Sequence, residues 1–464
     1  MEDLLQNAVD MMRDLGARYA DARFYGGDSE SITILKGKKV LSYASSQGVS
    51  VRCLLRNGWG MASTTDLNKV SIEKIARDAV KLSKIYSKCQ NIELAETKSY
   101  KKKEKMAGII DPKKMPIDEK IKLTEDIYKF CLAQKKIIDA KSNLSVNYLK
   151  RIIVNSEGTN VSVDSQRMRI ITMVVAKDGN KQREFYDTKG GFHGLELFKK
   201  YDWTELSKNV CNRSVELLNS KRVPNGKMPV ILAGEGGGTG LLAHEAVGHA
   251  IEGDYARMDR SFFNGAINKP VAAPNLSLID DGTKTIRDGN GSIVFDDEGV
   301  LAQKTYAIKD GIFKTFLTDR QSAAALNLEP TGNARAQDQN RRIYVRMRNT
   351  YIEPRDWKLE EMIEDTKFGI VCNKEKAGIE DPAGGSFQLF FIDGWIVENG
   401  KLKEPVYNIS VSESHVLVAL KSVNAIGKDI HFDAGFCGKG HEDWVSVGTG
   451  GPSVRLSQAV VGGV

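Results

Sequence analysis

The chain has 464 residues, of which 41% are hydrophobic and 27% are charged, and its formal net charge is +7. These values are ordinary for a globular protein and leave room for about two to four domains. The positive charge is too small for this length to indicate a nucleic-acid-binding protein, and we expect no direct contact with nucleic acid.

The first residues, MEDLLQNAVDMMRDLG, are acidic and amphipathic, unlike a secretory signal peptide. No apolar run approaches the roughly 20 residues that a membrane span needs. The cysteines at positions 53, 89, 131, 211, 372 and 437 are scattered and form no C-x-x-C pair. This pattern is typical of reduced thiols, so we expect a cytoplasmic protein without membrane contact.

The first half of the chain contains the same order of elements twice, offset by about 120 residues. Periodicity and turn signals predict, in order, a helix over 2–16, strands within 22–63, a helix over 71–87, a helix over 117–134, strands within 140–186 and a helix over 203–219. Asn57-Gly58 and Asp178-Gly179 are turns at matching positions. We therefore predict an N-terminal α+β domain over 1–222, made of two similar halves at about 1–95 and 106–222.

A polar segment over 95–105 separates these halves and includes the run Lys101-Lys102-Lys103-Glu104-Lys105. It has no interleaved aromatic residues and no nucleic-acid-binding motif, so we interpret it as a solvated linker or surface loop. The sequence does not indicate a function for the run.

The composition changes after Pro224-Asn225-Gly226. PVILA (229–233) is typical of a short buried strand, and from residue 262 onward strand and turn signals dominate, including VAAPNLSLIDDG. Helices are predicted near 320–326, 359–366 and 414–421. The expected C-terminal domain over 223–464 is mainly antiparallel β, with one inserted helix.

That inserted helix carries His244, Glu245 and His249 in the stretch GEGGGTGLLAHEAVGHAIEGD (234–254). The spacing His-Glu-x-x-x-His is one residue longer than the motif of zinc peptidases, in which two imidazoles bind the metal and the glutamate acts as general base. The preceding glycine run lacks the Lys-Ser/Thr of a phosphate-binding loop. We interpret it as a turn before the helix.

The spacing conflicts with regular helical geometry, because residues five apart lie about 140° around an α-helix and residues four apart about 40°. The two histidines can share a metal only if one turn holds an extra residue, as in a π-bulge. Gly248 is a residue that could ease such a distortion. Otherwise the helix is an ordinary amphipathic one with two unrelated histidines.

Several blocks of the second half are similar to the TldD/PmbA family, the so-called modulators of DNA gyrase. They are LLAHEAVGHAIEGD, FDDEGVLAQ (295–303), EPTGNARAQ (329–337), NTYIEP (349–354) and CGKG…VGTGGPSVRLSQAVVGG (437–463). The resemblance covers the whole second domain in the family's order. The chain keeps both the His-Glu-x-x-x-His motif and a late cysteine, so it resembles the TldD type.

The resemblance implies a zinc metallopeptidase, with iron not excluded, that cleaves peptides or unfolded segments. It further implies a heteromer with a metal-free PmbA/TldE-type paralogue, or a homodimer. It makes His244 and His249 ligands, Glu245 the base and Cys437 the third ligand. The loop after Cys437 is about one residue longer than the family pattern, so His441 and His431 remain alternatives for the third ligand.

Other polar residues in the matching blocks have two interpretations each. Glu252 and Asp254 either orient the histidines or are solvated carboxylates at the end of a helix. Arg335, Arg346 and Asn349 either hold a substrate carbonyl or the developing oxyanion, or form surface salt bridges. The competing function is a non-catalytic regulatory or DNA-associated protein with a structural metal, which has no use for Glu245 as a base.

Overall fold

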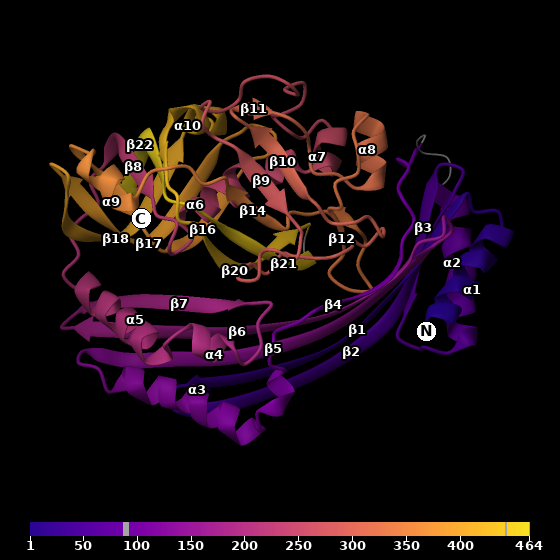
Figure 1. Ribbon diagram of the computed structural model, residues 1–464, viewed down its shortest axis with the longest axis horizontal. Helices are drawn as coiled ribbons and strands as arrows, with labels where there is room; N and C mark the ends of the chain where they lie inside the picture. The colour runs from indigo at the N-terminus through magenta and orange to yellow at the C-terminus, as the bar shows by residue number, and fades with distance from the viewer. Residues whose placement is uncertain (87–91, 441–442, 464) are drawn as a thin grey trace.

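The computed structural model describes residues 1–86, 92–440 and 443–463. It is a mixed α+β protein with long, mostly antiparallel sheets. Figure 1 shows a strongly curved N-terminal sheet with helices on its outer face and the C-terminal part of the chain against its inner, concave face. None of the described helices is both long and apolar enough to cross a membrane.

The first part of the chain forms one seven-stranded sheet and its helices. Its elements are α1 (Glu2–Asp14), β1 (Tyr19–Leu35), β2 (Lys38–Leu55), β3 (Gly58–Thr64), α2 (Lys69–Tyr86), β4 (Lys101–Met106), η1 (Pro112–Lys114), α3 (Ile117–Leu132), β5 (Ile137–Asn155), β6 (Asn160–Asp178), β7 (Lys181–Gly191), α4 (Leu197–Lys200) and α5 (Trp203–Leu217). The predicted long helices and both predicted turns are present. The short helix α4 was not predicted.

The strand order of this sheet is β3-β2-β1-β5-β6-β4, and β7 also pairs with β6. The first long strands of the two sets, β1 and β5, lie antiparallel at the centre. One apolar core packs under α1 and α2, and another under α3 and α5. The helices thus cover the two ends of the outer face and leave its middle open.

The prediction of a linker or surface loop over 95–105 is wrong for residues 101–105. Lys101–Met106 forms β4, which pairs in parallel with β6. Strand pairing uses only main-chain groups, and an edge strand tolerates charged side chains, which also discourage pairing with other chains. The four lysines of the run are exposed, as predicted.

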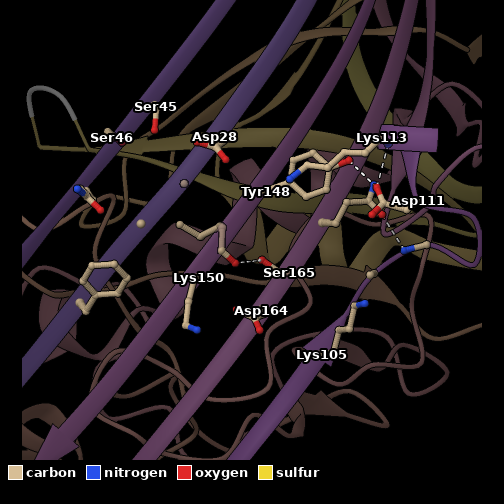
Figure 2. Close-up of a pocket in the computed structure, with 18 of the residues that line it drawn as sticks. Asp28, Ser45, Ser46, Lys105, Asp111, Lys113, Tyr148, Lys150, Asp164 and Ser165 are labelled. Atoms are coloured by element: carbon tan, nitrogen blue, oxygen red, sulfur yellow. Dashed lines mark hydrogen bonds between the residues drawn. The ribbon is translucent and has the colours of Figure 1, made fainter. Parts of the chain in front are cut away.

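A hollow of about 620 Å³ lies on the open middle of the outer face. Figure 2 shows lysines and aspartates from several strands around it, among them Lys105, Lys150 and Asp164. These three residues are register neighbours on β4, β5 and β6. Positive and negative charges therefore alternate across this hollow.

The second part of the chain begins with β8. Its elements are β8 (Gly226–Leu232), α6 (Gly238–Leu241), η2 (Leu242–Gly248), η3 (His249–Ile251), α7 (Gly253–Arg257), β9 (Leu278–Asp281), β10 (Lys304–Lys309), β11 (Ile312–Phe313), α8 (Arg320–Leu326), β12 (Ala334–Arg335), β13 (Tyr344–Val345), β14 (Asn349–Ile352), α9 (Leu359–Glu364), β15 (Phe368–Cys372), β16 (Glu375–Glu380), β17 (Phe387–Glu398), β18 (Lys401–Glu413), α10 (Val416–Ser422), β19 (Val423–Ile426), β20 (His431–Lys439), β21 (Asp443–Gly451) and β22 (Val454–Gly463).

Two larger sheets dominate this part, with the orders β11-β10-β9-β14-β21-β20 and β15-β8-β22-β18-β17-β16. Most pairings are antiparallel, but β14–β21 and β15–β8 are parallel. The three helices predicted near 320, 359 and 414 are present as α8, α9 and α10. Of the strand signal in VAAPNLSLIDDG, only β9 forms, because Pro274 cannot donate to a ladder in the middle of a strand.

The segment from α6 to α7 lies between these two sheets, and its apolar side chains belong to the largest core of the protein. The core fixes this segment against β14, β16, β17 and β21. The residues of the His-Glu-x-x-x-His motif are therefore held by rigid elements on several sides.

Candidate metal centre

The helix with the two histidines has the predicted irregularity. Leu242–Gly248 is a π-helix, and a 3₁₀ turn begins at His249. The wider turn holds the extra residue that the spacing requires. Gly248 has ordinary helical angles, and its importance lies elsewhere, because a Cβ there would come within 1.9 Å of Met347 Sδ. The glycine allows close packing and does not relieve the helical distortion.

The structure brings His244, His249 and Cys437 together from segments almost 190 residues apart. One ligand atom from each residue lies within 4.8 Å of the others. The rings of the two histidines are 5.4 Å apart and nearly perpendicular. Cys437 Sγ lies 3.4 Å from His249 Nε2. A tetrahedral zinc ion with ordinary bond lengths holds its nitrogen and sulfur ligands about 3.6 Å apart, so these residues fit the ion.

The pKa shifts of the three groups indicate that a positive charge is favoured next to the Cys437 sulfur. Burial opposes the charged forms of His244 and His249, but the nearby Cys437 sulfur raises the pKa of both imidazoles. Burial would also raise the pKa of Cys437, yet His249 and His244 lower it well below its usual value. A buried thiolate between two imidazoles is the donor set that a soft or borderline cation such as zinc prefers.

A buried carboxylate supports His249 from behind. Glu252 Oε2 lies 3.3 Å from His249 Nδ1 and accepts a hydrogen bond of 2.8 Å from Lys439 Nζ. Burial would raise the pKa of Glu252, but Lys439 and His249 lower it to about 2. Glu252 therefore keeps its charge and fixes the orientation of the imidazole, as the partners of metal-binding histidines usually do.

Asp254 lies one step further from the histidines. Its carboxylate accepts from Lys439 Nζ at 2.6 Å and from the Val345 amide at 3.3 Å. Lys439 was not among the predicted residues, although it lies two residues after Cys437 and alternate strand residues share a face. That register is the signal that could have identified it.

The other three predicted residues are buried, which rules out surface salt bridging as their role. Arg346 Nη2 donates to the Cys437 carbonyl at 2.5 Å and so supports the strand that carries Cys437. Arg335 donates to the Met347 and Ser446 carbonyls. The Asn349 amide donates to Asp281 O and Ser292 Oγ. Substrate contact by these side chains stays a prediction.

Glu245 lies beside the three donors but is more open than they are, with a quarter of its side chain exposed. Its carboxylate is 3.9 Å from His249 Nε2. Strand β16 passes directly over it, and a Cβ on Gly378 would come within 2.5 Å of Glu245 Cγ. The glycine in this strand thus leaves the space that the Glu245 side chain occupies.

Glu380, at the end of β16, is a second carboxylate that the sequence analysis missed. Burial raises its pKa to about 7, and the neighbouring Glu245 adds to the rise although His249 opposes it. Glu245, His249 and Glu380 also place donor atoms within 4.8 Å of one another. They form an alternative ligand set with one shared histidine. No sequence motif contains Glu380, because it lies on β16, far along the chain from the helix with the two histidines.

The two alternatives for the third ligand have different outcomes. His431 begins β20 as an exposed residue, and it lines a separate hollow with Phe432 and Asp433. Among the described residues, the groups of metal-binding side chains do not include it. His441 lies outside the described residues.

Comparison with known proteins agrees with this geometry. Residues 225–463 match the PmbA/TldA metallopeptidase C-terminal domain, 110–218 the central domain and 20–83 domain 1. A metalloprotease of Methanocaldococcus jannaschii is 37% identical over 446 residues, which cover 95% of this chain and 96% of that protein. The chain belongs to the PmbA/TldD metallopeptidase family. A zinc metalloprotease TldD homologue of Saccharolobus solfataricus is 29% identical and is covered to 98%.

Solved structures share the fold of this family member. A protein from Bacteroides thetaiotaomicron, described as a modulator of DNA gyrase, has a TM-score of 0.80 at 19% identity, with 100% of this chain and 98% of that chain covered. TldE from Thermococcus kodakarensis has a TM-score of 0.79 at 16% identity, with 99% and 100% covered. These structures support the fold alone.

Proposed function

We propose that this PmbA/TldD family member is a zinc-dependent peptidase, and that His244, His249 and Cys437 hold the ion. The observation that carries the proposal is the convergence of three buried donors beside one partly exposed carboxylate. A catalytic zinc commonly has three protein ligands and one open position, whereas a structural zinc has four protein ligands. The mixed Cys/His set favours zinc over iron.

The residues around the ion have separate roles in this proposal. A zinc ion held by His244, His249 and Cys437 would supply the positive charge that acidifies a water molecule and polarises the scissile carbonyl. Glu245 accepts the proton of the attacking water and delivers it to the leaving amine. Burial raises the pKa of Glu380 to about 7, so near neutral pH it carries a proton about half of the time, which limits its repulsion with Glu245. Glu252 and Lys439 keep His249 in place.

The substrate class follows from the strand that covers Glu245. Strand β16 is the edge of its sheet and pairs with β17 alone among the named strands of the described chain. An edge strand binds extended peptides through main-chain hydrogen bonds, largely independent of sequence. We therefore propose peptides or unfolded protein segments as substrates, because a folded protein rarely offers a free extended strand.

The assembly is also a proposal. No named strand of the described chain pairs with the outer edge of β2 between Lys38 and Gln47, and Val40, Leu41 and Tyr43 there are more than half exposed. Exposed apolar edges usually indicate an interface. We propose a heteromer with a metal-free PmbA/TldE-type paralogue, or a homodimer, in the cytoplasm, where the cysteines stay reduced.

The competing function, a regulatory or DNA-associated protein with a structural metal, has no role for the open carboxylate of Glu245. The substitution Glu245→Gln separates the two functions. We expect it to keep the zinc content and lower the rate of peptide hydrolysis by roughly a hundredfold or more, because the general base is lost. The control is Glu235→Gln, an exposed glutamate in the glycine run before the same helix.

Hydrolysis is measured with zinc-loaded protein and unstructured peptides, and zinc by elemental analysis. Activity of Glu245→Gln equal to that of Glu235→Gln would reject Glu245 as the base. An unaltered, zinc-loaded protein that cleaves no peptide would reject the peptidase itself.

A further inference from the structure

A hollow of about 320 Å³ lies between the inner face of the N-terminal sheet and strands β20 and β21. Its floor crosses β2, β1 and β5 and includes the small residues Ala44, Ser46, Gly27 and Ser145. Its wall toward the C-terminal part contains Phe436 and Ser446. Small side chains leave this space open where the two parts of the protein face each other.

Two arginines of β6 line one side of the hollow. Arg167 and Arg169 are two residues apart in the strand and so share its inner face. Met168 and Ile170, the alternate residues, belong to the core on the outer face. The Arg167 guanidinium lies 4.3 Å from the Phe192 ring centre, and that of Arg169 lies 5.4 Å from Phe436. Aromatic faces thus hold both cations in position.

Neither arginine has a carboxylate partner among the described residues. Arg167 makes one long hydrogen bond of 3.4 Å, to Ser165 Oγ, and its buried Nε has none. Burial, together with the nearby Arg151 and Arg335, lowers the pKa of Arg167 to about 9. Burial also lowers the pKa of Arg169. A partly buried cation without a counter-charge is costly, and a carboxylate in the hollow would remove that cost.

The charges of the hollow are therefore unbalanced. The one carboxylate among its described lining residues is Asp28, which belongs to the outer face, where it raises the pKa of the Tyr43 hydroxyl. The hollow on the outer face differs, because lysines and aspartates alternate around it (Figure 2). Of these two hollows, the inner one combines partly buried guanidinium groups with the absence of a carboxylate partner among the described residues.

The position of the hollow connects it with the metal centre. Phe436 and Ser446, which line it, are register partners, and the next pair along the same two strands is Cys437 and Val445. Consecutive strand residues are about 3.3 Å apart and point to opposite faces, so the hollow and the Cys437 side chain lie on opposite faces of β20, the edge strand of its sheet. The Tyr186 hydroxyl on β7 also donates to the Glu375 carbonyl of β16 at 3.2 Å, so β16 and β20 both lie along the inner face of the β6–β7 region.

We propose that Arg167 and Arg169 form a subsite for a carboxylate of the peptide substrate. The inference rests on the proposed peptidase function and gives it a preference for acidic peptides. The carboxylate is either an acidic side chain or the C-terminus of the peptide. A planar guanidinium binds both through paired hydrogen bonds.

Calorimetric binding to the zinc-loaded Glu245→Gln protein tests this subsite without turnover. The probes are N-acetylated peptides of one length. Each has either Glu or Gln at its centre, and each is made with a free and with an amidated C-terminus. We expect a carboxylate to improve the dissociation constant roughly tenfold. If the central Glu improves the dissociation constant, the subsite binds an acidic side chain. If the free C-terminus improves it, the subsite binds the C-terminal carboxylate.

The gain should fall below about twofold in Arg169→Gln and Arg167→Gln and be retained only in part in Arg169→Lys, which keeps the charge but loses the paired hydrogen bonds. The control is Arg183→Gln on β7, because that guanidinium bonds the Leu217 carbonyl and covers Tyr407. Equal affinity for acidic and neutral peptides, or a preference that survives both Gln substitutions, overturns the subsite. Hydrolysis of the neutral peptide by the unaltered protein is measured separately, so loss of the peptidase function would be seen independently.

Discussion

Two clusters of buried charge in this protein differ in how completely their groups are bonded. At the metal centre, Cys437, His244 and His249 direct their donor atoms at one another across 4.8 Å or less. The second cluster lies at the junction of the N-terminal sheet with the loop FDDEG (295–299), here called the sheet junction. There each carboxylate of the loop accepts hydrogen bonds from an arginine or from main-chain amides. The comparison teaches that burial and charge do not mark a functional site, whereas donors that face a common point do.

The sheet junction consists of ion pairs between the two parts of the chain. Arg52 donates to Asp21 at 2.7 Å and to Glu298 at 2.9 Å. Arg151 donates to Asp297 at 3.2 Å. Asp296 accepts from main-chain amides, including that of Ala334. This block of family-like sequence therefore holds the two parts together and does not contribute to the metal centre.

The largest effect is expected from Cys437→Ala, which removes the proposed third ligand. We expect zinc affinity to fall by more than roughly a hundredfold, because loss of a ligand should cost more than loss of a residue that only supports one. Hydrolysis should disappear. Competition with a chelator measures the affinity. Cys372→Ala, a buried thiol on β15 outside the described metal-binding groups, should keep the zinc. Equal zinc affinity in both variants would leave His441 as the leading candidate ligand.

A smaller and different effect is expected at the sheet junction. Arg52→Met removes the cation that donates hydrogen bonds to the buried Asp21 and Glu298 and should lower the free energy of unfolding by roughly 3–5 kcal/mol. The folded protein should still bind one zinc ion. Arg18→Met removes an exposed pair with Glu93 and should cost less than about 1 kcal/mol. Denaturant titration measures both, and zinc loss by folded Arg52→Met would contradict the distinction between the clusters.

The smallest effect concerns the residues behind the ligands. Lys439→Met removes the cation that keeps Glu252 charged and in place, so zinc affinity should fall roughly 10–100-fold. Lys439→Arg should restore part of it, which a general loss of stability would not predict. Lys403→Met, an exposed lysine on β18, is the control. If Lys439→Met binds zinc as tightly as this control, Lys439 does not support the centre.

The sequence predicted those features that local geometry controls. The long helices follow from apolar periodicity, and the π-helix follows from the five-residue spacing of His244 and His249. Glu380 and Arg169 could not be predicted, because the pairing of distant strands brings them to their sites. The run Lys101–Lys105 was misread because an edge strand is held by its main chain, and polar composition does not report that.

The location of a bound zinc ion tests the central claim most directly. Anomalous X-ray diffraction at the zinc absorption edge, from crystals of the zinc-loaded protein, measures it. We predict one peak about 2.0–2.1 Å from a nitrogen of both His244 and His249 and about 2.3 Å from Cys437 Sγ, with Glu245 outside bonding distance. A peak bonded to Glu245, His249 and Glu380 would contradict the account, because Glu245 would then be a ligand and could not act as the general base.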